Sequence, residues 1–465
     1  MHRTTRLAVT VLAAISLLAG ACSGDDAPAA TDDTEADAGG DGATISVPDD
    51  HATIQEAVDA AEPGDLVLVS PGTYEEAVDV ETEDLTIRGL DRNEVILDGG
   101  FELENGIRVF ADGVAVENMT AKNYTTNGFF WTGVTGYRGS YLTAFRNGDY
   151  GVYAFDSVKG QLEHIFASGS PDAGVYIGQC YPCDAVLDDV TAEYNGLGYS
   201  GTNSGGNLLI VNSTFRYNRS GIVPNSGSYE LCYPGRDNTI VGNVVHDNMQ
   251  PDTPAIDVAL LAMGTGILVA GSNRNVVERN LVYDHERVGI GLVPFPESDA
   301  NDGVPDPSTW DTPCADVRDD PPAVTDPELL ATVLWDAMQN RIVGNAISGS
   351  GLADLAVGSL QPDIAGLENC FSENTLESTA PLELEALAPC DGDPTATDWT
   401  AGALDLVALI TSERPPSVDY ETAPTPEPGD QPNMPDAATA PARPATDVPF
   451  TVDVDAIALP TRPAG

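Results

Sequence analysis

The stretch NTIVGN at 238–243 returns as NVVERN at 275–280, NRIVGN at 340–345 and NCFSEN at 369–374. Such self-similarity is typical of repeat architectures. Asparagines that recur at one place in each repeat would lie above one another in a stack, where their side-chain amides can hydrogen-bond as a ladder. We therefore expect these asparagines to have a structural role rather than a catalytic one.

Glycines that open short apolar runs set the length of the repeat. Between residues 106 and 290 they follow one another at steps of 22 to 24 residues, with one longer step of 45. Each period holds two or three short runs rich in Val, Ile, Leu and aromatic residues, which are typical of strands. The period predicts an all-β fold, a parallel β-helix in which each repeat is one rung. These glycines are Gly106, Gly128, Gly151, Gly174, Gly198, Gly221, Gly266 and Gly289.

Two longer spacings predict lateral loops. Asn238 and Asn275 are 37 residues apart, which is 14 more than one rung of 23, and Asn275 and Asn340 are 65 apart, which is 42 more. The excess residues place inserts at about 248–261 and 294–337.

The segment TIQEAVDAAEPGDLVLVSPGTY at 53–74 begins with a Thr53…Glu56 capping pattern and apolar residues at helical spacing. It predicts a helix that covers the first rung, since a bare end would expose the core and unpaired strand edges. Together with LTIRG at 85–89 and the asparagine rungs, it resembles the right-handed parallel β-helix proteins of the pectin-lyase-like superfamily over residues 44–375. The rungs are most similar to carbohydrate-binding and sugar-hydrolase repeats, which also occur in periplasmic accessory proteins of nitrous oxide reduction.

The resemblance implies a single-stranded right-handed parallel β-helix with an N-terminal capping helix and long lateral loops. It does not select one reaction, because the superfamily contains lyases, hydrolases, esterases, epimerases and non-enzymes. We assign the β-helix to residues 44–390 and a Pro-, Ala- and Asp-rich low-complexity tail to 391–465. That composition predicts a disordered or loosely packed segment, although FTVDVDAIALP at 450–460 could add a strand.

The N-terminus predicts export. Basic residues precede an apolar run that ends at Ala19-Gly20-Ala21, so residues 1–21 read as a signal peptide. LLAGAC at 17–22 resembles a bacterial lipobox, which would lipidate Cys22 at the outer face of the plasma membrane; an ordinary signal peptidase cut would release a secreted protein instead. Residues 22–43 are polar and predict a disordered, lipid-anchored linker.

Cysteine arithmetic favours the lipoprotein. Seven cysteines are odd in number, but giving one to a lipid leaves six, an even set suited to an oxidising compartment. Four lie in loops on one edge of the rungs and would form two disulfides, and two would close the C-terminal end. The six are Cys180, Cys183, Cys232 and Cys314 on the edge, and Cys370 and Cys390 at the end. The Cys-x-x-Cys at 180–183 could instead be redox-active or bind a metal.

The charge of the chain excludes some partners. Asp and Glu outnumber Lys and Arg by 73 to 20, and nucleic acids and anionic membrane surfaces bind basic patches. We therefore expect no nucleic-acid partner and membrane contact through the lipid anchor alone. The alternative interpretation is that the acidity only keeps an exported protein soluble in a salty medium.

Side-chain columns suggest a polysaccharide surface. The second residue after each repeat glycine should face solvent, because side chains alternate along a strand. Aromatic rings in that column, with carboxylates and arginines two places before the glycines, could stack on and hydrogen-bond a sugar chain. An aromatic ladder that only stabilises the strands is the alternative. These residues are Phe130, Tyr153 and Tyr176, then Asp149 and Asp172, then Arg219 and Arg287.

Asp149 and Asp172, one rung apart, would be close enough to share a proton or a cation. They could act as acid and base in glycoside hydrolysis, with Arg219 beside them, or hold Ca²⁺ for β-elimination of a uronate. The stretch NDGVPD at 301–306 resembles part of an Asp-rich calcium loop and offers Asp302 and Asp306, with Asp299 nearby. Calcium is the one cofactor that the sequence suggests.

His246 and His285 stand near aspartates at turns, where they could serve catalysis or be solvated turn residues. The sequence as a whole predicts a monomeric, cell-surface β-helix protein that binds an extracellular polysaccharide and could cleave it as a lyase or a hydrolase. The alternative is a non-catalytic surface scaffold or accessory protein. Whether the chain is an enzyme is left open at this point.

Overall fold

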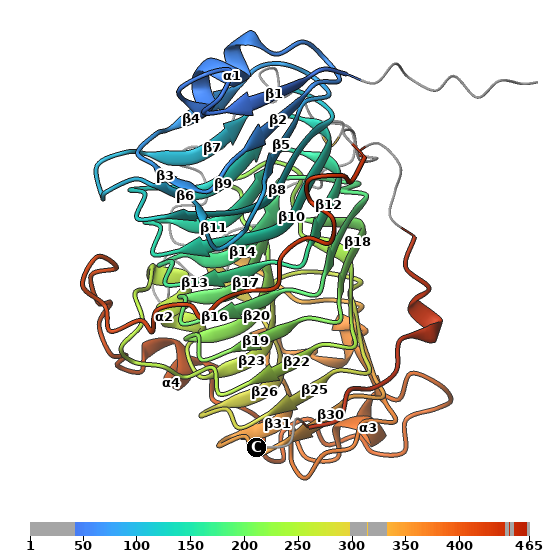
Figure 1. The fold of residues 1–465 in the computed structure, drawn as a ribbon. Coiled ribbons are helices and arrows are strands. Elements are labelled where there is room, and N and C mark those ends of the chain that lie inside the picture. Colours follow the sequence, from blue (N-terminus) through green and yellow to red (C-terminus); the bar gives the residue numbers. More distant parts are fainter. Residues whose placement is uncertain (1–41, 298–313, 315–332, 442–445, 447–450, 463–465) are drawn as a thin grey trace, which may run out of the picture. The chain divides into compact units, whose positions relative to one another are not determined.

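The structure is a computed structural model that describes residues 42–297, 314, 333–441, 446 and 451–462. Three strands make each rung. Two strand columns merge into a sheet of 20 strands, because β8 and β10 continue around the corner, and the third column is a sheet of 11 strands. Each strand pairs in parallel with the equivalent strand one rung away, as Val152 does with Val175. The result is the parallel β-helix that the repeat predicts (Figure 1).

The first column contains β1 (Thr44–Val47), β2 (Leu66–Val69), β5 (Thr86–Gly89), β8 (Val114–Lys122), β10 (Thr135–Phe145), β12 (Val158–Glu163), β15 (Ala185–Asp188), β18 (Gly205–Val211), β21 (Arg236–Val241), β24 (Val276–Glu278), β29 (Arg341–Val343) and β32 (Cys370–Ser372). The second contains β3 (Gly72–Tyr74), β6 (Val95–Asp98), β13 (Phe166–Ser168), β16 (Thr191–Glu193), β19 (Thr214–Arg216), β22 (Val244–His246), β25 (Leu281–Tyr283) and β30 (Ala346–Ser348). The third, the 11-stranded sheet, contains β4 (Val78–Val80), β7 (Asn105–Val109), β9 (Asn127–Thr132), β11 (Tyr150–Phe155), β14 (Ala173–Gly178), β17 (Leu197–Thr202), β20 (Ser220–Asn225), β23 (Thr265–Ala270), β26 (Val288–Val293), β31 (Ala353–Val357) and β33 (Thr379–Ala380).

The repeat glycines stand where one rung touches the next. A Cβ at Gly151 would lie 2.6 Å from the carbonyl oxygen of Gly174, and one at Gly221 would lie 2.5 Å from that of Gly266. Any larger residue would therefore push the rungs apart. The residue after each glycine faces the core, as predicted, and every one of these side chains is 0% exposed: Phe129, Val152, Val175, Ile222, Ile267 and Ile290.

The asparagine ladders are confirmed. The first asparagines of the four stretches form one ladder, in which the amide nitrogen of Asn238 donates to Asn275 at 2.7 Å and the bonding continues to Asn369. The second asparagines form another, from Asn243 to Asn374. The residue before each ladder asparagine has the positive φ that turns the chain at the corner, so the asparagines themselves do not supply the tight backbone angle.

Removing one ladder amide should cost about 3 kcal/mol, because the buried neighbouring amides lose their partners. Asn280 accepts from both nitrogens of Asn243 and donates to Asn345. We expect Asn280→Ala to lower the free energy of unfolding by that amount in urea titration. The control is Gln361→Ala, at an exposed amide bonded to Asp336, for which we expect a loss below about 1 kcal/mol. Equal losses would contradict a structural role for the ladder.

The predicted N-terminal helix is present as α1 (Ile54–Ala60), with Thr53 as its N-cap. The hydroxyl of Thr53 accepts from the backbone N–H of Glu56 at 3.1 Å. Its apolar face, which includes Ile54, is buried in the same core as the first rungs. The remaining helices are α2 (Asp257–Ala262) in the first insert, α3 (Leu384–Leu387) and α4 (Leu406–Thr411), with 3-10 turns at Ala365–Leu367 and Val454–Ala456. No helix in the described part of the chain is long and apolar enough to cross a membrane.

The described part of the tail is packed against the rungs, which corrects the expectation of a disordered or loosely packed segment. Its backbone carbonyls accept hydrogen bonds from arginines of the β-helix: Arg219 to Pro415 and Pro416, Arg146 to Ala423 and Thr425, Arg92 to Pro432, Arg88 to Ala437, Ala440 and Pro441, and Arg279 to Val454. Proline removes backbone donors, so such a chain cannot pair with a sheet edge, but its carbonyls remain good acceptors for guanidinium groups. Composition alone did not reveal these partners.

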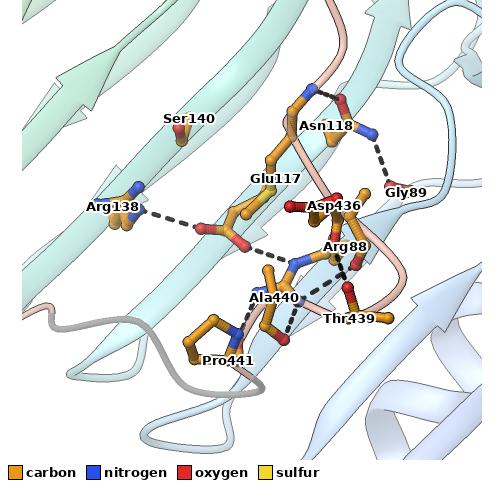
Figure 2. Close-up of polar contacts among 12 residues, drawn as sticks. Arg88, Gly89, Glu117, Asn118, Arg138, Ser140, Asp436, Thr439, Ala440 and Pro441 are labelled. Atoms are coloured by element: carbon orange, nitrogen blue, oxygen red, sulfur yellow. Dashed lines mark hydrogen bonds and ion pairs between the residues drawn. The ribbon is translucent and has the colours of Figure 1, made fainter.

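The tail reaches a buried charge network on the large sheet. Figure 2 shows Glu117 between Arg88 and Arg138, with Ala440 and Pro441 of the tail beside Arg88. Glu117 is 0% exposed, and its two carboxylate oxygens accept from Arg88 at 2.7 Å and from Arg138 at 3.0 Å. Further along, residues 452–457 pack on Val186, Val211 and Val241 as a 3-10 turn rather than the strand considered above.

The predicted cysteine groups are confirmed as Cys180–Cys183, Cys232–Cys314 and Cys370–Cys390. At Cys180 and Cys183 the structure has a disulfide, and two cysteines bonded to each other in this way do not bind a metal ion. The long insert leaves and re-enters through an antiparallel pair, β27 (Phe295–Glu297) and β28 (Val333–Trp335).

Candidate functional site

The aromatic column predicted from the glycine register lies on the 11-stranded sheet. Phe130 on β9, Tyr153 on β11 and Tyr176 on β14 are register neighbours, and Tyr150 joins them. The Phe130 and Tyr153 rings stack at 4.6 Å, and those of Tyr150 and Tyr153 at 4.2 Å. These rings therefore cover one another's faces and leave mainly their edges for a ligand.

Tyr176 does not face solvent, contrary to the expectation for its column. It is 1% exposed, and its hydroxyl donates to Glu230 at 2.6 Å. Glu230 belongs to the loop 226–235, which connects β20 to β21 and covers this part of the sheet. A strand pattern predicts which side chains point away from the core, but not whether a loop from a later rung covers them.

Asp172 and Glu230 are the unusual acids of the site. Asp172 accepts from the hydroxyl of Tyr150 at 2.6 Å. Burial raises the pKa of Asp172 to about 7, with a further rise from the charge of Asp149. Burial also raises the pKa of Glu230 to about 8, with a smaller contribution from Asp172. Glu230 therefore keeps its proton near neutral pH, whereas Asp172 is only partly protonated there. We give the name tyrosine recess to this cluster of side chains, made by Tyr150, Tyr153, Asp172, Tyr176 and Glu230.

Asp149 lies at the border of the tyrosine recess and is more exposed than Asp172, although partial burial raises its pKa too. The sequence singled out both aspartates but missed Glu230 and Tyr150. Tyr150 directly precedes a repeat glycine, next to Asp149, so its position was readable from the register. Glu230 lies in a lateral loop with no periodic signal; only the placement of that loop on the same edge hinted at it.

Arg219 does not belong to the tyrosine recess, which corrects its assignment beside the aspartates. Its guanidinium is 0% exposed and donates to the carbonyl oxygens of Pro251, Thr253, Pro415 and Pro416. Its donors are thus used to bind the first insert and the tail. Arg287 lies further along the column, where it lines a cavity of about 90 Å³ under α2 and α4 and donates to Ser412 at 3.3 Å.

The two histidines near turn aspartates are buried, His246 at 7% and His285 at 2% exposure, so they are not solvated turn residues. The Nε2 atom of His285 lies 3.3 Å from the amide of Asn248, so His285 ends a third ladder that starts at Asn195. Burial lowers the pKa of His285 to about 3, which keeps it neutral. His246 stacks on Tyr283 at 4.7 Å and contacts Asp247 at 2.7 Å.

The metal and lipid predictions are not tested by the structure. Asp299, Asp302 and Asp306, proposed for calcium, and Cys22, proposed for lipidation, lie outside the described residues. Within the described ranges, no group of three or more His, Cys, Asp or Glu side chains is placed to hold a metal ion.

The raised pKa values of the tyrosine recess predict a pH dependence of stability. In the unfolded chain both carboxyl groups ionise near pH 4, whereas the folded chain holds their protons to about pH 7 and 8. Their contribution is complete below pH 4 and is lost as the pH rises to 8, because the folded state binds more protons over this range. We expect the midpoint of thermal unfolding to fall over this pH range.

The double variant Asp172→Asn with Glu230→Gln should flatten this decline, since neither amide titrates. Glu102→Gln, at an exposed carboxylate, is the matched control and should leave the slope unchanged. A slope in the double variant equal to that of the natural chain would contradict protonation of the two acids.

Comparison with known proteins concerns the fold. The family described as "Right handed beta helix region" matches residues 127–294, and no curated protein matches the chain. The A-module of a mannuronan C-5 epimerase from Azotobacter vinelandii is a similar structure, at 14% identity over 71% of this chain and 95% of that chain, with a TM-score of 0.45. An alginate lyase from Paenibacillus sp. str. FPU-7 is 16% identical over 68% and 98%, with a TM-score of 0.44. The pectate lyase Pel9A is 11% identical over 76% and 81%, with a TM-score of 0.40. Identities this low say nothing about the reaction, but the family match agrees with the predicted right-handed parallel β-helix, and that fold is confirmed.

Proposed function

We propose that this protein binds an extracellular polysaccharide at the tyrosine recess and hydrolyses its glycosidic bonds with Asp172 and Glu230. One observation carries the proposal: two carboxyl groups with pKa values of about 7 and 8 lie in one cluster of tyrosine side chains, each accepting a tyrosine hydroxyl at 2.6 Å. Burying two acids without an opposite charge costs stability, and perturbed acids of this kind concentrate at functional sites.

The two pKa values suit acid and base catalysis at neutral pH. Glu230, with the higher pKa, would remain protonated and donate to the leaving oxygen, while Asp172 would be partly ionised and act as base or nucleophile. The hydroxyls of Tyr150 and Tyr176 would orient the two carboxyl groups. The choice between retention and inversion depends on the carboxyl separation in the substrate complex.

The charge of the recess favours a neutral glycan. The groups that shift its pKa values are acids and tyrosines, and Arg219, the cation predicted to lie beside the aspartates, binds the first insert and the tail instead. A uronate chain would find no cation among these groups to pair with its charge, so we expect neutral polymers to bind better than acidic ones.

The proposal places this activity outside the cell. Residues 1–21 would direct export, Cys22 would carry a lipid, and 22–43 would tether the β-helix as a monomer at the outer face of the plasma membrane. Three disulfides support an oxidising compartment. Calcium at Asp299, Asp302 and Asp306 remains part of the proposal for the insert, where it would stabilise a loop.

The test is to incubate the protein with neutral and acidic polysaccharides. Cleavage is measured in two ways, as new reducing ends and as the absorbance of unsaturated uronides. We expect reducing ends alone, and a fall in kcat of about 100-fold or more in Asp172→Asn and Glu230→Gln, since acid–base groups contribute about this factor. Glu102→Gln should keep full activity. If the absorbance of unsaturated uronides appears, the reaction is elimination and not hydrolysis.

A non-catalytic scaffold is the second candidate, and the stacking of the ring faces at 4.2 and 4.6 Å favours it. A scaffold would neither cleave nor retain any polymer of the panel. Binding without cleavage, lost in Tyr153→Ala, would leave a carbohydrate-binding protein.

A further inference from the structure

We infer that Glu297, at the base of the long insert, is a positioning residue that holds the loop 226–235 so that Glu230 stays in the tyrosine recess. The inference rests on the proposed function in one respect, namely that Glu230 is a catalytic group. It assigns a role to β27 and β28, which lie outside the regular rungs.

Glu297 is tied directly to the loop. Its side chain is 7% exposed, and its carboxylate accepts from the backbone N–H of Ser228 at 3.0 Å and from the Ser228 hydroxyl at 2.7 Å. The indole N–H of Trp335, on the partner strand β28, donates to the same carboxylate at 2.6 Å. A buried carboxylate is costly unless donors satisfy it, and these donors join the insert to the residue two places before Glu230.

The rest of the loop is held from other sides. The amide of Asn203 accepts from Gly227 and donates to the carbonyl oxygens of Gly227 and Glu230. Gln179 accepts from the N–H of Leu231 at 2.9 Å. The Cys232–Cys314 disulfide then ties the end of the loop to the insert again. The insert thus holds the loop on both sides of Glu230, at Ser228 and Cys232, while Asn203 and Gln179 fix the backbone at Gly227, Glu230 and Leu231.

The ionisable groups around Glu230 make the attachment of the loop measurable through the pH at which Glu230 titrates. They come from neighbouring rungs and from the loop, and they are Tyr150, Tyr153, Asp172, Tyr176 and Tyr229, with Glu297 of the insert acting on Tyr229. None of them is cationic, so the proton on Glu230 depends on its staying out of water. If the loop loosens, Glu230 becomes solvated and titrates at lower pH.

The experiment follows the midpoint of thermal unfolding of the full chain from pH 4 to 9. The upper part of the pH dependence is the fall of the midpoint at the highest pH values, where Glu230 loses its proton. Its disappearance in Glu230→Gln identifies it as the titration of Glu230. We expect Glu297→Gln to move this upper part down by about one pH unit or more. Trp335→Phe, which removes a single donor, should move it less, and it serves as the second variant if Glu297→Gln does not fold.

The matched control is Asp354→Asn. Asp354 is another buried carboxylate, 2% exposed, that accepts from the backbone N–H groups of Ser350, Glu377 and Ser378 far from the recess. Asp354→Asn should lower the midpoint at all pH values, but it should not change the pH at which the upper part of the fall occurs. The inference is overturned if Glu297→Gln and Trp335→Phe behave like Asp354→Asn, or if the natural chain shows no upper part.

Activity is a separate readout. If a glycan is cleaved, the upper limb of the pH–rate profile should move with the unfolding data in Glu297→Gln. If no glycan is cleaved, the proposed function fails, while the shift in the unfolding data still decides whether Glu297 positions Glu230.

Discussion

Ending the chain after Cys390 should lower the free energy of unfolding by on the order of 5 kcal/mol, because the tail contributes many hydrogen bonds worth roughly 1 kcal/mol each. Arg219, Arg146, Arg92 and Arg88, which lie on successive parts of the stack, donate to its carbonyls. In a solenoid each rung contacts only its neighbours. The tail is therefore the segment that couples distant rungs, and without it we expect unfolding to become less cooperative.

The measurement is urea unfolding followed by tryptophan fluorescence and by circular dichroism. The two signals should coincide in the full chain and separate in the truncated one. A chain that ends after Pro441 is the matched control, since it keeps the segment bound by these four arginines and should retain most of the stability. If the chain ending after Cys390 unfolds at the same urea concentration as the full chain, the tail does not stabilise the rungs.

Replacing Glu117 by Gln should cost about 3 to 5 kcal/mol, the usual effect of breaking a buried ion pair by removing one partner. Glu117 is 0% and Arg88 1% exposed, so Arg88 would keep its charge with only carbonyl oxygens as partners (Figure 2). Arg138 would keep Glu163 and would lose less. Thermal and urea unfolding would measure the cost.

Two comparisons separate the buried charge from general damage. Asp79→Asn breaks the exposed pair of Asp79 with Arg108, whose side chains are 49% and 31% exposed, and should cost less than about 1 kcal/mol. The double variant Arg88→Met with Glu117→Leu removes both charges and should recover most of the loss from Glu117→Gln. A loss in Glu117→Gln no greater than that in Asp79→Asn would show that the network carries no buried charge.

The candidate site was half readable from the sequence. The glycine register correctly grouped Phe130, Tyr153 and Tyr176, since these occupy equivalent positions on consecutive rungs. It also placed Asp172 beside them, at the start of the same rung as Tyr176. It failed for Arg219 and for the exposure of Tyr176, because both depend on segments outside the rungs. Glu230, the carboxyl group with the highest pKa of the site, carried no periodic signal in the sequence.

The sequence by itself determined the parts of this protein that repeat. The rung length, the inward column, the asparagine ladders and the grouping of the cysteines follow from local spacing, because each rung must reproduce the same hydrogen bonds and the same core contacts as the last. Tertiary structure alone decided where the tail lies, which arginines it engages, and how the insert brings Glu297 to Ser228 and thereby Glu230 to Tyr176. These contacts join residues far apart in the chain, such as Arg88 and Pro441, whose positions follow no period. They form because guanidinium and carboxylate groups that leave water must find partners, and only the folded chain determines which partners are within reach.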